Sequence, residues 1–207
     1  MTSRAVHLFV FENLADWEAS FAIAGIQNPR FQRAPGRYRV VTVAPTREPV
    51  TTMGGVRILP DLALSEIGQE DSAMLILPGG EAWEQGKNRE AIAKARAFIA
   101  ACVPVAAICG ATLALAGAGL LDNRYHTSNT RDYLAASGYR GGRFYREVAA
   151  IADQGVITAS GVAPLEFARE IFEALHLYDS YALDAWYTLF KYGDATAYCE
   201  LAQYATQ

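Results

Sequence analysis

Short apolar runs alternate with longer amphipathic segments along most of this chain. The runs have the length of buried strands and lie at 5–11, 38–44, 72–80 and 104–108. Segments with apolar residues at helical spacing lie at 15–25, 89–102, 110–118, 163–176 and 180–204. Parallel strands need crossover connections, and helices usually supply them. The alternation therefore predicts an α/β fold in which helices cover both faces of a mostly parallel sheet.

Three further segments complete this organisation. Residues 51–61 predict a hairpin around Gly54 and Gly55, and residues 147–160 predict two strands about a turn. Residues 26–37 carry two prolines and a glycine and predict a surface loop. Neither repeats nor linkers interrupt the 207 residues. We expect one domain over 1–207, with the aromatic-rich residues 178–207 as a C-terminal helical extension.

Charge and cysteine usage exclude several classes of protein. The net charge is −4 and no block of Lys and Arg is present, which argues against nucleic-acid and anionic-membrane partners. No apolar run reaches the ~20 residues that span a bilayer. Cys102, Cys109 and Cys199 lack CxxC spacing, so we expect no disulfide framework, metal or cofactor. Cys102, on the core side of its predicted helix, and Cys199 are expected to be structural. These features predict a cytoplasmic, enzyme-sized protein.

Several polar and small residues directly follow the predicted strands. In parallel α/β sheets, ligands bind at the carboxyl ends of the strands. Glu12 and Asn13 follow the first strand, Gly79 and Gly80 follow the strand at 72–80, and Cys109 follows the strand at 104–108. We therefore expect these residues to converge on one crevice.

Cys109 stands where a predicted strand turns sharply into a helix. A nucleophile elbow strains the backbone at such a turn and requires tiny neighbours, which Ala107, Gly110 and Ala111 supply. The N–H groups of the helix that begins at Gly110 are expected to lower the pKa of the Cys109 thiol. The alternative is that Cys109 is a small core residue, because free cysteine is commonly buried.

The glycine pair in "LPGG" (77–80) is the second local signal. Backbone N–H groups of a glycine turn after a strand are open to an anion or to a developing oxyanion, although such pairs often only turn the chain. Beside an elbow, Gly80 and Gly110 are the predicted oxyanion donors. Trp83 follows the turn and either walls the pocket or covers apolar surface.

Taken together, "ILPGG", "VAAICGATLALAGAGLL" and "VITASGVAPLEFAREIFEAL" resemble the ThiJ/PfpI superfamily of the class I glutamine amidotransferase-like fold. The resemblance runs from the first strand to about Leu175. It implies a flavodoxin-like three-layer sandwich that carries a reactive cysteine on a nucleophile elbow. It also implies that backbone amides after the "PGG" turn face this cysteine.

The resemblance further implies an acidic residue, from the helix after the first strand, that hydrogen-bonds the thiolate. By position in "ADWEAS", Glu18 is that residue. Asp16 and Glu12 are the alternatives, and Glu18 would then be an exposed charge on an amphipathic helix.

One departure from the family pattern concerns histidine. Hydrolytic members place a histidine after the elbow helix, where this chain has Asn129 in "LLDNRYHTSNT". His126 is predicted to lie on a strand and, by period two, to face away from Asn129. His7 and His176 are not placed for chemistry. Because asparagine accepts no proton at neutral pH, ordinary Cys–His acyl transfer is in doubt.

The predicted pocket comprises Gly79, Trp83, Asn129 and Asp132, with Tyr133 beside Asp132 as a further rim residue. We expect a cysteine-dependent hydrolase, amidase or hydratase that acts on a small molecule, with proteolysis disfavoured. The alternatives are a redox-sensing or stress-response protein that uses oxidation of Cys109, and a ligand-binding module without turnover. Similar proteins are usually dimers, so a homodimer is expected.

Overall fold

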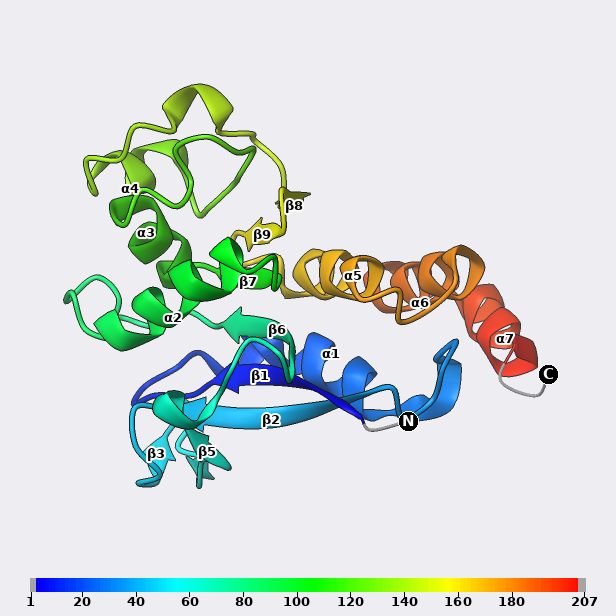
Figure 1. The fold of residues 1–207 in the computed structure, drawn as a ribbon. Helices are drawn as coiled ribbons and strands as arrows, with labels where there is room; N and C mark the ends of the chain where they lie inside the picture. Colours follow the sequence, from blue (N-terminus) through cyan, green and yellow to red (C-terminus); the bar gives the residue numbers. More distant parts are fainter. Residues whose placement is uncertain (1–2, 205–207) are drawn as a thin grey trace.

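A seven-stranded sheet organises the chain, and its strand order is β5-β2-β1-β6-β7-β9-β8 (Figure 1). The computed structural model describes residues 3–204. Neighbouring strands pair in parallel except β8 with β9. The strands of this sheet are β1 Arg4–Phe9, β2 Tyr38–Ala44, β5 Leu62–Ala63, β6 Ser72–Leu77, β7 Val105–Ile108, β8 Ala150–Asp153 and β9 Val156–Ala159. The predicted mostly parallel α/β fold is confirmed.

Helices follow most of the parallel strands, as expected for crossover connections. They are α1 Asp16–Gln27, α2 Arg89–Ala100, α3 Gly110–Gly117, α4 Arg131–Ala135, α5 Pro164–Ala174, α6 Ser180–Tyr192 and α7 Ala195–Tyr204. Single 3₁₀ turns lie at Pro29–Phe31, Leu64–Glu66 and Gly142–Phe144. The predicted loop at 26–37 therefore contains one short turn.

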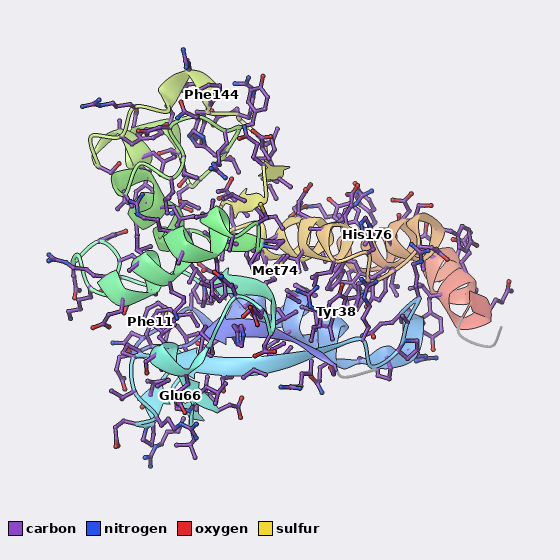
Figure 2. The ribbon with its side chains drawn as sticks, viewed as in Figure 1. Phe11, Tyr38, Glu66, Met74, Phe144 and His176 are labelled. Carbon is purple, nitrogen blue, oxygen red and sulfur yellow. The ribbon has the colours of Figure 1, made fainter. Side chains whose placement is uncertain are left out.

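The side chains of β1 and β2 show which helices cover which face. Tyr38 pairs with Arg4, and its hydroxyl donates to the carbonyl of Leu175 at the end of α5 (3.0 Å; Figure 2). His7 lies on the opposite face of the sheet because it is three residues from Arg4, and its ring meets Phe98 of α2. Helix α5 packs against α1, whereas α2 covers the other face. The helices thus form the outer layers of a three-layer sandwich.

Burial is greatest in the central strands. Every residue of β6 and of β7 is buried, which explains why their sequences are continuous apolar runs rather than alternating ones. Met74 of β6 lies in the middle of this core (Figure 2). Strand β6 ends shortly before Gly79, and β7 ends directly before Cys109. The buried central strands therefore hold both residues at the carboxyl edge of the sheet, where the crevice was predicted.

Both predicted hairpins are present, and one edge strand, β5, was not predicted. Strands β8 and β9 form the hairpin predicted at 147–160. Strands β3 (Val50–Thr51) and β4 (Arg57–Ile58) pair antiparallel around the predicted Gly54–Gly55 turn. Strand β5 escaped prediction because its two residues carry no periodic signal. The segment between α3 and β8 projects as a separate lobe that bears Phe144 (yellow-green in Figure 1; Figure 2).

The prediction of one closing helix at 180–204 is wrong. The chain breaks between α6 and α7 at Gly193, which adopts φ 68° and donates its N–H to the carbonyl of Leu189. A glycine in this left-handed conformation ends a helix without steric cost. The predicted extension runs to residue 207, and residues 205–207 lie outside the described part.

The expected positions of two cysteines also need correction. Cys102 was predicted on the core side of a helix, but α2 ends at Ala100 and Cys102 is exposed at φ 57°. Cys199 in α7 is exposed as well. Among the described residues, no helix is both long and apolar enough to cross a bilayer.

Replacing Gly193 by alanine should destabilise the protein by about 1 kcal/mol. No atom lies within 4 Å of the position that the new Cβ would take, so the cost comes from the left-handed backbone alone. Urea unfolding measures the change in free energy. Gly142→Ala is the matched control, because that site is equally open but has no left-handed φ. Equal stability of the two variants would contradict the role of Gly193.

Candidate active site

Cys109 connects β7 to α3 with a strained backbone. Its φ of 56° and ψ of −124° lie in a region that costs a non-glycine residue of order 1–3 kcal/mol. The Cys109 N–H donates to the Ala159 carbonyl of β9 (3.1 Å), and the Cys109 carbonyl accepts from the Thr112 N–H of α3 (3.0 Å). Hydrogen bonds to β9 and to α3 therefore fix the turn. The turn places the Cys109 side chain at the carboxyl edge of the sheet.

Glycines on both flanking strands make room for this side chain. A Cβ at Gly79, after β6, would lie 2.6 Å from the Cβ of Cys109. A Cβ at Gly161, after β9, would lie 2.8 Å from the Cys109 sulfur. Sequence reasoning named Gly79 but missed Gly161, although both follow a buried strand at the same edge of the sheet.

Glu18 reaches the sulfur from the first turn of α1. Its side chain is 1% exposed, and its Oε2 accepts a hydrogen bond from the Gly79 N–H. A second hydrogen bond joins the carboxyl group to the Cys109 side chain. Glu18 and the sulfur therefore share one small space beside Gly79 and Gly161.

The two alternative acids bind the β3–β4 hairpin instead. Asp16 accepts hydrogen bonds from the Thr52 hydroxyl and the Gly54 N–H, and Glu12 accepts one from the Thr51 N–H. These contacts connect α1 and the segment before it to the hairpin. Of the three candidate acids, Glu18 is therefore the one that faces Cys109.

Asn129 contacts the sulfur at the position where hydrolytic relatives were expected to carry histidine. Its Oδ1 accepts from the Gly161 N–H (2.9 Å), which orients the amide so that Nδ2 donates to the Cys109 sulfur (3.4 Å). His126 is buried and bonds to the Arg124 carbonyl and the Tyr139 hydroxyl. It forms a single bridge with Tyr145 rather than part of a strand.

Burial and charge oppose the predicted low pKa of the thiol. Burial, followed by repulsion from the Glu18 carboxylate, raises the pKa of Cys109 to about 11. The Gly110 N–H and Asn129 act in the predicted, lowering direction but are outweighed. Burial also raises the pKa of Glu18. The pKa of the thiol is therefore raised where the sequence predicted a lowered one, because desolvation and the charge of Glu18 outweigh the Gly110 N–H and Asn129.

The glycine turn at Gly79 and Gly80 binds the Glu18 carboxylate and packs against Gly110. The Gly79 N–H binds Glu18 rather than facing open space. The Gly110 N–H hydrogen-bonds the sulfur. The Gly80 carbonyl accepts from the Trp83 N–H and lies close beneath Gly110. Trp83 is buried against Phe9 and touches Gly110 from within the core, in agreement with the packing alternative.

The two predicted rim residues behave differently. Asp132 lies exposed in the first turn of α4. Tyr133 is half-buried, and its hydroxyl donates to Oε1 of Glu84 (2.8 Å). Burial, the bond to Glu84 and the charges of Cys109 and Glu18 raise the pKa of Tyr133. Tyr133 thus lies near the site, and its partner Glu84 was not predicted.

Glu12 and Asn13 do not join this site. They line a cavity of about 450 Å³ together with Glu81 and Lys87. Cys109 is not among the residues that line this cavity. The expectation that Glu12 and Asn13 converge with Cys109 on one crevice is therefore wrong. Among residues 3–204, no three His, Cys, Asp or Glu side chains gather closely enough to hold a metal ion.

Replacing Glu18 by glutamine should lower the pKa of Cys109 from about 11 toward the ordinary thiol value of ~8.5, because repulsion by the carboxylate is lost. The pH dependence of Cys109 alkylation, followed by peptide mass spectrometry, measures the shift. Asp16→Asn is the control, since Asp16 binds the hairpin. An unchanged or higher pKa in Glu18→Gln would refute the repulsion.

The chain resembles known proteins over most of its length. It is 39% identical to the "uncharacterized protease YoaZ" of Bacillus subtilis over 92% of each chain. A thiJ/pfpI family crystal structure from Bacillus anthracis superimposes with a TM-score of 0.90, 38% identity and coverage of 98% of this chain and 97% of that one. A "glutathione-independent glyoxalase DJR-1.2" of Caenorhabditis elegans is 27% identical over 68% of this chain and 75% of its own. The model of the DJ-1/PfpI family matches residues 4–174, and this chain belongs to that family.

Proposed function

We propose that this protein is an enzyme in which the Cys109 thiol adds to the carbonyl carbon of a small molecule. The observation that carries the proposal is the buried Glu18 carboxylate hydrogen-bonded to the Cys109 side chain. A base must lie within hydrogen-bond reach of the proton it removes, and Glu18 meets this condition where histidine is absent. Burial raises the pKa of Glu18, which brings this pKa closer to the value that suits a general base near neutral pH.

The first step transfers one proton and forms one bond. The thiol proton moves to the Glu18 carboxylate as the sulfur attacks the carbonyl carbon. The electron pair of the carbonyl π bond moves to oxygen, and Glu18 then returns the proton to that oxygen. Neutral Glu18 no longer repels the sulfur, so the high resting pKa of Cys109 does not prevent attack. The adduct is a hemithioacetal when the substrate is an aldehyde.

Two features support a small carbonyl compound as substrate. A relative is named a glyoxalase, an activity on aldehydes. Gly79, Gly161 and Glu18 also closely flank the side chain of Cys109, which agrees with a small substrate. Proteolysis, after which the Bacillus subtilis relatives YoaZ and YdeA are named, is therefore not part of this proposal.

The redox alternative has weaker support. Oxidation of cysteine follows the fraction of thiolate present at rest. A pKa of about 11 makes that fraction small at neutral pH. Proton transfer to Glu18 during attack removes this obstacle for a bound electrophile. The raised pKa of the thiol therefore supports the enzyme over the sensor.

Replacing Cys109 by alanine should reduce turnover of methylglyoxal by more than about 10³-fold, because the attacking atom is lost. Consumption of methylglyoxal and formation of lactate, which contains the atoms of methylglyoxal plus one water, are measured together. Cys199→Ala should retain full activity, since this cysteine is exposed on α7. Turnover that survives in Cys109→Ala, or the lack of turnover of both methylglyoxal and glyoxal by the wild type, would disprove the proposal.

We also propose that a second copy of the chain covers the apolar residues at the start of α1. Trp17 is 50% exposed, Met53 48% and Val162 91%. Hydrogen bonds join the segments that carry them: the Trp17 indole N–H donates to the carbonyl of Gly161, which precedes Val162, and the Met53 backbone N–H donates to the Leu14 carbonyl. Exposed apolar side chains grouped in this way are typical of protein interfaces.

Replacing Val162 by aspartate should shift the protein from dimer to monomer, because the carboxylate would lose its water at the interface. Light scattering during size-exclusion chromatography gives the molar mass. Val148→Asp is the matched control, since Val148 is also an exposed valine and belongs to the lobe between α3 and β8. A wild-type protein that is monomeric at micromolar concentration would contradict the dimer.

A further inference from the structure

Two N–H groups hydrogen-bond the Cys109 sulfur in the resting protein. One is the backbone N–H of Gly110, and the other belongs to Nδ2 of Asn129, 3.4 Å from the sulfur. The N–H of Gly79 lies at the same edge of the sheet but binds the Glu18 carboxylate. The side-chain amide of Asn129 is therefore a donor beside the sulfur that comes from neither the elbow nor the glycine turn.

The orientation of the Asn129 amide is determined by Gly161. The Gly161 N–H is a donor and needs an acceptor, and Oδ1 of Asn129 accepts from it (2.9 Å). An amide turned the other way would set Nδ2 against this N–H, with two donors in contact. Nδ2 therefore faces Cys109. Within residues 3–204 the sulfur is the only acceptor that Nδ2 meets, so one of its two N–H groups is left for a substrate.

The two residues before Asn129 anchor it to the body of the protein. The Thr127 N–H donates to the Thr158 hydroxyl of β9 (2.9 Å). The Ser128 hydroxyl pairs with the hydroxyl of Thr112 in α3 (2.6 Å), and the same Thr112 hydroxyl donates to the carbonyl at the elbow (2.6 Å). These four side chains are buried. A donor held in this way needs no reorganisation during a reaction.

Addition to a carbonyl group creates a need for such a donor. As the sulfur bonds to the carbonyl carbon, the electron pair of the π bond moves to the oxygen. This oxygen lies two bonds from the sulfur in the adduct, so a donor that rests on the sulfur can reach it. The amide of asparagine does not titrate, and it therefore remains a donor at any pH at which Glu18 acts as the base.

We propose that Asn129 is a catalytic residue whose Nδ2 hydrogen-bonds the substrate's carbonyl oxygen while the Cys109 sulfur adds to the carbonyl carbon. This inference rests on the proposed function, because it concerns addition to a carbonyl at the same cysteine. Glu18 removes the thiol proton in this step, whereas Asn129 donates a hydrogen bond and loses no proton. Asparagine thus serves as an oxyanion donor where a histidine base was expected.

Two reagents separate this role from an effect on the thiol itself. With p-nitrophenyl acetate, the sulfur bonds to the acetyl carbon, negative charge forms on the oxygen, and its electron pair returns as p-nitrophenolate leaves. With iodoacetamide, the sulfur bonds to the methylene carbon as iodide leaves with the electron pair, and no oxyanion forms. In both reactions the thiol proton passes to Glu18 and then to water.

Peptide mass spectrometry gives both rates at each cysteine of the full chain. The ratio of the acylation rate to the alkylation rate largely cancels the pKa and the exposure of the thiol, because both reactions use the same sulfur. A change in this ratio at Cys109 therefore measures stabilisation of the oxyanion.

Asn129→Asp keeps an acceptor for the Gly161 N–H but has no donor, and Asn129→Ala removes the donor without adding charge. In both variants the ratio at Cys109 should fall by about 10²-fold, the usual effect of losing one oxyanion donor. Asn123→Ala is the matched control, since Asn123 is an exposed asparagine of the same lobe. It should leave the ratio unchanged.

An unchanged ratio in Asn129→Ala overturns the proposal even if both rates fall, because a common loss reports on the thiol and not on the oxygen. A wild-type ratio at Cys109 that is no higher than at the exposed Cys102 and Cys199 overturns it as well. A variant that does not fold is recognised when Cys109 is alkylated as fast as the exposed cysteines. The other Asn129 variant then decides the outcome.

This test and the test of the proposed function fail separately. Absence of methylglyoxal turnover would reject the proposed function, and the ratio would still be measurable, because it needs a single acylation and no turnover. Conversely, an unchanged ratio in the Asn129 variants would leave the dependence of methylglyoxal turnover on Cys109 untouched.

Discussion

Burial of the Glu18 carboxylate against the Cys109 thiol is the interaction on which the rest of the site depends. An isolated carboxylate in a protein interior costs several kcal/mol unless donors offset the loss of water. Here the Gly79 N–H and the thiol are its partners. The pair holds one negative charge, which passes to the sulfur when Glu18 takes the proton. This shared charge contributes to the high resting pKa of the thiol, and the base-assisted attack that we propose depends on it.

The backbone around this pair is constrained by the order of the strands. Strands β6 and β9 flank β7, so the connections after all three strands meet at one edge of the sheet. Cys109 takes the strained turn, while Gly79 and Gly161 leave space beside it. A side chain on either glycine would displace the sulfur or Glu18. The parallel sheet therefore determines which residues can approach the thiol, and it places glycines where the chain comes closest.

The lobe between α3 and β8 supplies the polar surroundings of the sulfur. Asn129 donates to the sulfur from this segment, and Tyr133 connects it to Glu84. His126 is the histidine nearest to Asn129 in the sequence. Its ring hydrogen-bonds the Arg124 carbonyl and the Tyr139 hydroxyl, both within the lobe. In the proposed mechanism the proton chemistry depends on Glu18, because the amide of Asn129 cannot act as a base. The part assigned to the lobe is to orient polar groups around the sulfur.

The sequence by itself determined the α/β class, the elbow at Cys109 and the short list of acids near it, because periodicity and small residues are local properties. It also indicated that Asn129 stands in place of histidine. The choice of Glu18 over Asp16 and Glu12 required the tertiary structure, since each acid finds its partner in a segment distant in the chain. The same holds for Gly161, for the bond between Tyr133 and Glu84, and for the break at Gly193. Most decisively, the pKa of Cys109 depends on burial and on the charge of Glu18, and both exist only once the sheet and α1 have brought these groups together.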